Sequence, residues 1–170
     1  MSNIFEGKAV VLRTPTEVDL PYIRSLWADP DTMREVGGPI FRSPEQMAAW
    51  FRQMVDPGSD KDRYFLTAVG GQLVGEASWH RYDAATKTAE LNIKIEAKHR
   101  GRGHFKQALR LLLERYFVDF GGEVMRDPVA LDNTAGQQAL RKFGFEHDTS
   151  RTDVFMVRMT LDQYLKIRSG

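Results

Sequence analysis

The segment Thr88–Leu109, TAELNIKIEAKHRGRGHFKQAL, decides the fold of this chain because two periodicities meet within it. Apolar and polar residues alternate through Thr88–Glu96, which is the pattern of a β-strand with one buried face. From His104 onward apolar residues recur every three or four positions, as on one face of an amphipathic helix. Gly101 and Gly103 lie between the two patterns. The sequence therefore predicts a strand, a glycine loop and a helix start in direct succession.

The rest of the chain alternates between strand and helix patterns. The further strands expected are Lys8–Leu12, Tyr64–Val69, Gln72–Tyr82, Val129–Leu131, Phe145–Asp148 and Asp153–Thr160. The helices expected are Thr16–Ala28, one that starts at Ser43-Pro44, His104–Phe120 and Thr134–Phe143. Gly70-Gly71 predicts a tight hairpin turn. This order predicts an α/β fold with a mostly antiparallel sheet and one crossover pair in its middle.

Length and composition limit the classes of protein that fit. A chain of 170 residues with 42% hydrophobic residues suits one domain, residues 1–170, with its own core. Lys and Arg number 24 against 23 Asp and Glu, so the molecule as a whole attracts neither nucleic acid nor an anionic membrane. The absence of cysteine excludes disulfides, thiolate metal sites and a cysteine nucleophile.

Targeting and metal signals are also missing from the sequence. The N-terminal residues lack the apolar core of a signal peptide, and no apolar run approaches the ~20 residues that span a bilayer. We therefore expect a cytoplasmic protein. The four histidines do not show the helical spacing of a zinc site, so no metal is expected.

The glycine loop before His104 has the character of an anion site. Glycines let backbone N–H groups converge at a helix start, where the helix dipole favours negative charge. Arg100, Arg102 and Lys106 add positive charge, so a phosphate or pyrophosphate fits, although an ordinary solvated basic helix start remains open. A triphosphatase phosphate loop fails because His104 follows Gly103. The dinucleotide fingerprint lacks its third glycine.

Two motifs in the expected order resemble those of the GCN5-related N-acetyltransferase (GNAT) superfamily. Arg100–Phe105 matches the Arg/Gln-x-x-Gly-x-Gly/Ala pyrophosphate motif at the Arg and the first Gly, with Phe105 where a small residue is usual. Asn133–Phe145 is similar to the second signature, in which an Asn opens a helix that ends Lys-Leu-Gly-Phe. Resemblance to the ribosomal-protein alanine/serine acetyltransferase branch comes from Leu12-Arg13, Asp29-Pro30 and Ser43-Pro44-Glu45.

The resemblance implies a mixed sheet of about six to seven strands with about four helices and an acetyl-CoA cleft between splayed central strands. Backbone groups of Ile93 and Ile95 would bind the pantetheine arm, Asn133 would bond to it, and Arg100 would add charge. Phe105 is expected to turn its ring into the core. The pyrophosphate would lie on the backbone amides of Gly101, Arg102, Gly103, His104, Phe105 and Lys106.

The resemblance also suggests which groups carry the chemistry. Glu90 would act as the general base through water, with Asp127 as a second candidate, while a solvent-facing strand carboxylate is the other interpretation of Glu90. The Ile95 amide would serve the thioester oxygen. The family's usual acids are replaced by Leu140 and Gly136, so Thr134, a water or unassisted departure of the thiolate remain open.

The function expected from these residues is acetyl-CoA-dependent transfer of an acetyl group to a primary amine, on a protein N-terminus or a small molecule, without a covalent enzyme intermediate. His80 lies on the strand that lines the acceptor groove in the family. Because the usual Tyr and Ser are missing, a non-catalytic acyl-CoA-binding or sensing module is the alternative. Neither nucleic acid nor a membrane is expected as a partner, and a monomer and a homodimer both remain open.

Overall fold

The computed structural model describes residues 9–170, which form one continuous seven-stranded sheet. Its strands are β1 (Val10–Arg13), β2 (Arg63–Val69), β3 (Gln72–Asp83), β4 (Thr88–Ile95), β5 (Val124–Val129), β6 (Glu146–Asp148) and β7 (Phe155–Thr160). The order across the sheet is β1-β2-β3-β4-β5-β7-β6, and only β4 and β5 run parallel. The predicted antiparallel sheet with one central crossover is therefore confirmed; the expected strand start at Lys8 lies outside the described residues.

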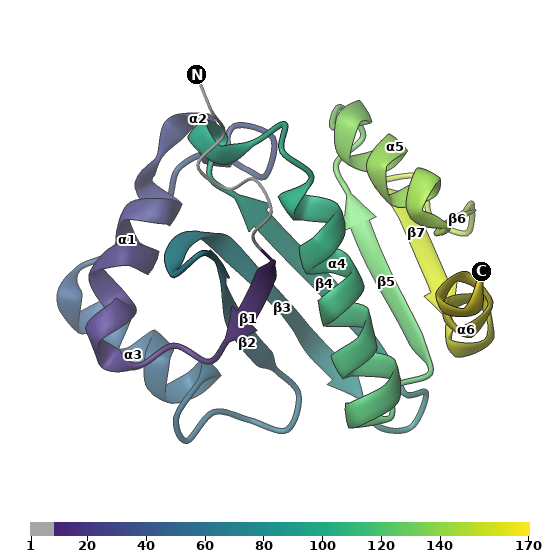
Figure 1. Cartoon of the computed structure of the whole chain (residues 1–170), viewed down its shortest axis with the longest axis horizontal. Coiled ribbons are helices and arrows are strands. Elements are labelled where there is room, and N and C mark those ends of the chain that lie inside the picture. Colours follow the sequence, from purple (N-terminus) through teal and green to yellow (C-terminus); the bar gives the residue numbers. More distant parts are fainter. Residues whose placement is uncertain (1–8) are drawn as a thin grey trace.

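Helices lie on both faces of this sheet. They are α1 (Leu20–Ala28), α2 (Pro30–Met33), α3 (Pro44–Met54), α4 (His104–Glu114), α5 (Thr134–Phe143) and α6 (Leu161–Ser169). In Figure 1, α4 crosses in front of the central strands, α1 and α3 lie beside the β1–β2 end, and α5 and α6 lie beside β5 and β7. As the crossover between the parallel strands, α4 covers the middle of one face.

Two hydrophobic cores lie on opposite faces of the sheet. On the α4 side, Leu109 and Leu112 are fully buried against Trp79 and other strand residues. On the α1 and α3 side, Ile23 packs with Leu66 in a smaller cluster. Burial of one such side chain contributes about 1.5–3 kcal/mol, so the two clusters hold the helices against the sheet.

The sheet opens between its two parallel strands. β4 and β5 pair only through Thr88–Glu90, opposite Val124–Arg126, and the ladder stops there. Leu91–Ile95 remains paired with β3 but not with β5. The predicted splaying of the central strands is thus present in the structure, and it exposes backbone groups in the middle of the sheet.

The sequence prediction for β5 was wrong. The expected strand Val129–Leu131 is a strand over Val124–Val129, with Pro128 inside it. The Val124 amide donates to the Lys87 carbonyl, on the β4 side of the strand. The backbone groups of every second residue in a strand point to the same side, so the Pro128 nitrogen also points toward β4, where the sheet opens. A proline there removes no ladder hydrogen bond, which explains why this strand tolerates a residue that usually interrupts one.

Three helical features also differ from the sequence prediction. α2 and α6 were not expected, although a capping box marks the start of α6: Thr160 Oγ1 accepts from the Gln163 amide at 3.2 Å. The helix expected over His104–Phe120 is α-helical to Glu114 and then forms a π-helical turn over Arg115–Phe120. Gly121, at a φ of +92°, ends it.

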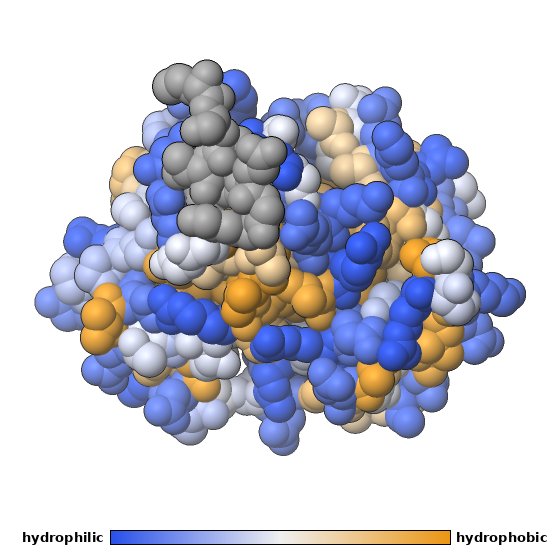
Figure 2. All heavy atoms as spheres, viewed as in Figure 1, coloured by the Kyte–Doolittle hydropathy of each residue, from blue (hydrophilic) through white to orange (hydrophobic). Residues whose placement is uncertain are grey.

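The outer surface carries little continuous apolar area in the view of Figure 2, where hydrophilic side chains cover most of the face and hydrophobic ones form small areas. Among residues 9–170, no helix has the length and apolar character needed to span a membrane.

Candidate active site

The glycine loop and the start of α4 form one wall of the site. Gly101 and Gly103 have φ values of +82° and +80°, which disfavour residues with a Cβ, and both adjoin open space. Gly103 is the N-cap of α4 and has no side chain to bond the first-turn amides. The Phe105 and Lys106 amides of this first turn have no intrahelical acceptor, which favours an anion at this helix start.

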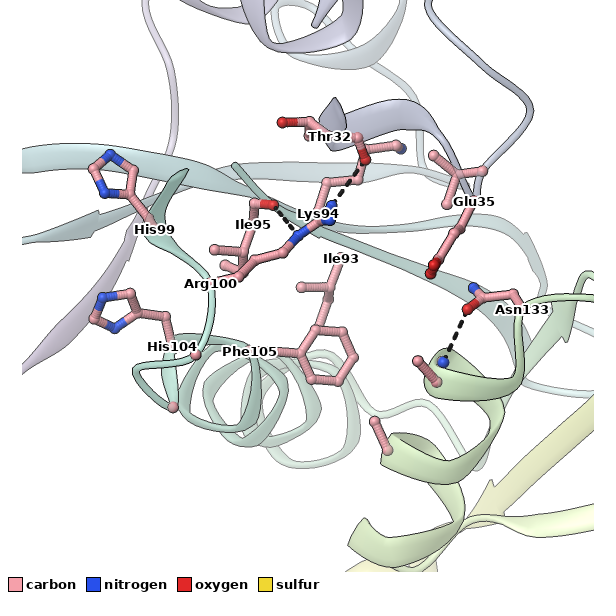
Figure 3. Close-up of a pocket in the computed structure, with 16 residues that line it drawn as sticks. Thr32, Glu35, Ile93, Lys94, Ile95, His99, Arg100, His104, Phe105 and Asn133 are labelled. Carbon is pink, nitrogen blue, oxygen red and sulfur yellow. Dashed lines mark hydrogen bonds between the residues drawn. The ribbon is translucent and has the colours of Figure 1, made fainter. Parts of the chain in front are cut away.

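Arg100 holds the loop in place through its guanidinium. Its Nε donates to the Ile95 carbonyl at 3.0 Å and its terminal nitrogen to the Thr32 carbonyl at 2.9 Å (Figure 3). The side chain thus ties the end of β4 to α2 while still lining the cavity. The positive charge that Arg100 is expected to add to an anion site stays a prediction. The two hydrogen bonds show that its side chain also fixes the position of the loop. Arg102 and Lys106 are exposed beside it.

Phe105 lies at the junction of the core and the cavity. Its side chain is half-buried and packs against the larger core. The ring also faces Ile93 across the cavity wall (Figure 3). The expectation that the ring turns into the core is therefore only partly fulfilled, because the same ring forms a wall of the opening beside the glycine loop.

Asn133 closes the opposite side of this cavity, whose volume is about 400 Å³. Its Oδ1 accepts from the Gly136 amide at 2.9 Å and caps α5 (Figure 3). A Cβ at Gly136 would lie 2.6 Å from Asn133 Nδ2, so a larger residue there would require the Asn133 side chain to shift.

In β4, the backbone N–H and C=O groups of every second residue point toward the opening. The Glu96 amide donates to Val74 of β3 at 2.8 Å, so the even-numbered residues of β4 bond to β3. The N–H and C=O groups of Ile93 and Ile95, which are odd-numbered, therefore point to the open side. The bond from Arg100 to the Ile95 carbonyl agrees with this direction. Both residues named by the sequence analysis thus line the opening, in the manner of an unpaired strand edge.

A second cavity, of about 910 Å³, lies on the α1 and α3 side of the opening. At its base Glu76 is 1% exposed and accepts hydrogen bonds from several surrounding groups. These are Trp27 Nε1 at 2.6 Å, Tyr64 Oη at 2.9 Å, Asn92 Nδ2 at 2.6 Å and Lys94 Nζ at 3.3 Å. Sequence reasoning missed Glu76, because one carboxylate within the strand Gln72–Tyr82 gives no local signal.

Glu90 lies in this second cavity and is 5% exposed. The interpretation of it as a solvent-facing carboxylate is therefore wrong. Its oxygens lie 3.0 Å from Arg126, 3.6 Å from Arg81 and 3.8 Å from His80. Burial lowers the pKa of His80, which favours the neutral imidazole. The role of Glu90 as a base stays a prediction.

Asp127, the second candidate base, lies on β5 at the opening. Burial raises the pKa of its carboxyl to about 7, and the charge of Glu90 adds to the rise while Lys94 opposes it. A carboxyl with a pKa near neutrality suits general-base chemistry at neutral pH. Leu140, in contrast, is 2% exposed within the core.

The two cavities meet through a third, of about 310 Å³, that lies within the opening. It shares Ile93, Phe105 and Asn133 with the cavity beside the glycine loop. It shares Asn92 and Asp127 with the cavity above Glu76. A ligand that enters along α4 can therefore reach Asp127 from one face of the sheet while a second ligand approaches from the other.

The fold is similar to that of spermidine N-acetyltransferase from Vibrio cholerae in complex with CoA and spermine. The two structures superpose with a TM-score of 0.81 at 17% identity, over 92% of this chain and 98% of that one. A structure of the Vibrio cholerae enzyme with manganese ions gives 0.75 at 16% identity, over 95% and 98%. At this level of identity the likeness shows a shared fold.

Sequence comparison adds the family. Ribosomal-protein-serine acetyltransferase of Escherichia coli (strain K12) is 29% identical over 85 residues, which are 49% of this chain and 46% of that protein. The match thus spans about half the length of the curated relative. The model of the acetyltransferase (GNAT) domain matches residues 9–146. With the sheet opening, the glycine loop at α4 and Asn133 at α5 in the arrangement described above, this chain belongs to the GNAT family of acetyltransferases.

Proposed function

We propose that this protein transfers an acetyl group from acetyl-CoA directly to a primary amine. The passage through the sheet opening carries the proposal. It joins a cavity beside a helix start that suits an anion to a cavity that holds Asp127, so two substrates could meet without a covalent enzyme intermediate.

The groups around the first cavity fit acetyl-CoA. The amides from Gly101 to Lys106 would bind the pyrophosphate, and Asn133 Nδ2 would bond to the pantetheine arm. Ile93 and Ile95 would add backbone bonds of the kind a neighbouring strand makes. The open space beside Gly101 and Gly103 leaves room for phosphate oxygens.

Asp127 is the base that best suits the second cavity. Acetyl-CoA supplies an activated acetyl group, and the amine must lose a proton before it attacks. The Asp127 carboxylate would accept that proton directly or through one water, and Glu90 would keep its pKa high. The Ile95 amide would stabilise the thioester oxygen. A thiol with a pKa of about 8.5 leaves without a strong acid, which agrees with the apolar Leu140.

Thermal unfolding with acetyl-CoA tests the first half of the proposal. A ligand that binds only the folded state stabilises it by about 2.7 kcal/mol at 100 times its dissociation constant. We expect Gly103→Asp to abolish this stabilisation, because a carboxylate would occupy the anion site. Measurement of the melting temperature with acetyl-CoA, ATP and NAD, each in separate samples, gives the result.

Gly71→Asp is the matched control for this variant. Gly71 has a φ of +81° and adjoins open space, as Gly103 does, but it lies in the β2–β3 hairpin. Both variants carry the same backbone strain and the same added charge. Equal loss of the acetyl-CoA shift in both, or an equal shift with ATP in the unmodified protein, would contradict the proposed site.

The non-catalytic acyl-CoA-binding module stays the second candidate, because Leu140 and Gly136 occupy the positions of the family's usual acids. Both functions predict stabilisation by acetyl-CoA. Only the enzyme releases CoA and forms an N-acetyl product when amines are added. The names of the relatives give spermidine and ribosomal-protein serine as amine sources in those proteins, and both belong in the first acceptor panel.

A further inference from the structure

In the second cavity, some charged side chains have partners of opposite charge and others do not. Glu76 accepts four hydrogen bonds, one of them from Lys94, so its carboxylate has no capacity left for a ligand. Glu90 is paired with Arg126 at 3.0 Å and with Arg81 at 3.6 Å. The negative charges at the base of the cavity are thus balanced by side chains of the protein itself.

Asp62 is partly engaged by its neighbours. Its Oδ2 accepts from Ser59 Oγ at 2.7 Å and its Oδ1 from the Arg81 amide at 3.3 Å. Asp127 is the remaining acidic residue that lines the cavity, and the proposed function uses it to accept a proton. A polyamine needs further open carboxylates for its other ammonium groups. Among residues 9–170 the cavity offers one further carboxylate with acceptor capacity, the half-buried Asp62, which Ser59 and the Arg81 amide already hold in place.

Two cations of the same cavity have no acidic partner. The half-buried Arg42 guanidinium lies 5.4 Å from the Trp27 ring centroid, and within the described chain no carboxylate lies in ion-pair range of it. Lys61 is exposed at the same cavity and also lacks an ion pair among the described residues. These two cations favour an anion and repel an added ammonium group.

The wall between Arg42 and the strands is aromatic. Trp50 packs edge to face against Trp27 at 4.9 Å and against Tyr64 at 4.8 Å, measured between ring centroids. All three rings line the cavity. Rings fixed by such contacts give a rigid apolar surface beside the guanidinium, which suits the hydrocarbon part of a small ligand.

We propose that the acceptor is a small amine that also carries a carboxylate. Its amino group would lie at Asp127, its hydrocarbon part against the tryptophans and its carboxylate at Arg42, with Lys61 adding charge at the rim. This inference rests on the proposed acetyl transfer and narrows it to amino acids and related aminocarboxylates, in preference to polyamines.

Pairs of acceptors that differ only in the carboxylate test the inference. Phenylalanine is compared with phenethylamine, and γ-aminobutyrate with propylamine, with spermidine as the polyamine. We expect kcat/KM to be about tenfold higher, or more, for the better aminocarboxylate than for its partner, since a charged hydrogen bond is gained. Spermidine should be the poorer substrate.

Variants at Arg42 identify the source of the preference. Arg42→Gln should remove it mainly through KM, Arg42→Lys should keep part of it, and Arg42→Glu should raise the activity with spermidine. Arg52→Gln is the matched control, because Arg52 is exposed on α3 and outside the cavity. Unchanged melting temperatures would show that each variant folds.

Binding measurements separate this inference from the proposed function. Calorimetric titration of each pair into protein saturated with CoA reports carboxylate preference without turnover. Preference for the aminocarboxylate that disappears in Arg42→Gln supports the inference even when no product forms, in which case the catalytic proposal fails. Equal affinity and equal kcat/KM within each pair, or spermidine as the best acceptor, would overturn the inference and leave acetyl transfer standing.

Discussion

At the scale of single residues, the proton chemistry depends on how Asp127 and Glu90 share charge. Asp127 is half-buried near a second carboxylate, and both conditions favour its neutral form. Glu90, in contrast, lies 3.0 Å from Arg126 and 3.6 Å from Arg81. Two carboxyls on adjacent strands thus have different environments, which suits one to exchange a proton and the other to position it.

The pH profile of the enzyme should show this difference. A base must be deprotonated to act, so kcat/KM should rise with pH and level off above an inflection near 7, the value of the Asp127 pKa. Asp127→Asn should lower kcat/KM by about 100-fold or more and remove the inflection. Steady-state rates measured from acidic to alkaline pH provide the test.

Glu90→Gln distinguishes a positioning role from a direct one. Since the negative charge of Glu90 raises the pKa of Asp127, its removal should move the inflection to lower pH while much of the plateau rate remains. A rate as low as that of Asp127→Asn, with no inflection, would instead make Glu90 the base. The pH of the inflection in the unmodified enzyme, compared with that in Glu90→Gln, therefore shows which of the two carboxyls is the base.

At the scale of elements, local sequence signals were strong where capping residues or turns fix the backbone. Ser43 accepts from the Gln46 amide at 3.1 Å and starts α3 as its sequence indicated. Gly70 and Gly71 form the predicted hairpin turn with positive φ values. The prediction for β5 was wrong because Pro128 is tolerated only where the neighbouring strand has moved away, which no local pattern shows.

The cap of α6 allows a prediction of stability. Thr160→Ala removes the hydrogen bond from the Gln163 amide to Oγ1 and should lower the free energy of unfolding by about 1 kcal/mol. Thr152→Ala, at an exposed loop position, is the control and should change it little. Urea unfolding curves of the two variants give the difference, and equal stabilities would show that α6 does not need this cap.

At the scale of the whole molecule, the opening between β4 and β5 brings together the cavity beside the glycine loop and the cavity above Glu76. Its backbone groups suggest a direct test. With acetyl-CoA bound, the amides of Ile93 and Ile95 should exchange hydrogen more slowly, because they would gain partners in the opening. The amides of Asn92 and Lys94 bond to β3 and serve as internal controls. Hydrogen exchange followed by NMR resolves these neighbours, and equal slowing at all four would argue against insertion at the opening.

Much of this protein was determined by its sequence alone. The alternation from Thr88 to Glu96, the glycine loop before His104 and the Asn133 signature predicted the strand, the helix starts and the family, because each depends on backbone conformation and on residues close in the chain. Tertiary structure alone decided that Glu76 would be buried under Trp27, that Glu90 would be paired with Arg126 and that Arg42 would lack a carboxylate partner among residues 9–170. These properties are electrostatic, and they arise between residues from different strands and loops whose distances no local pattern sets.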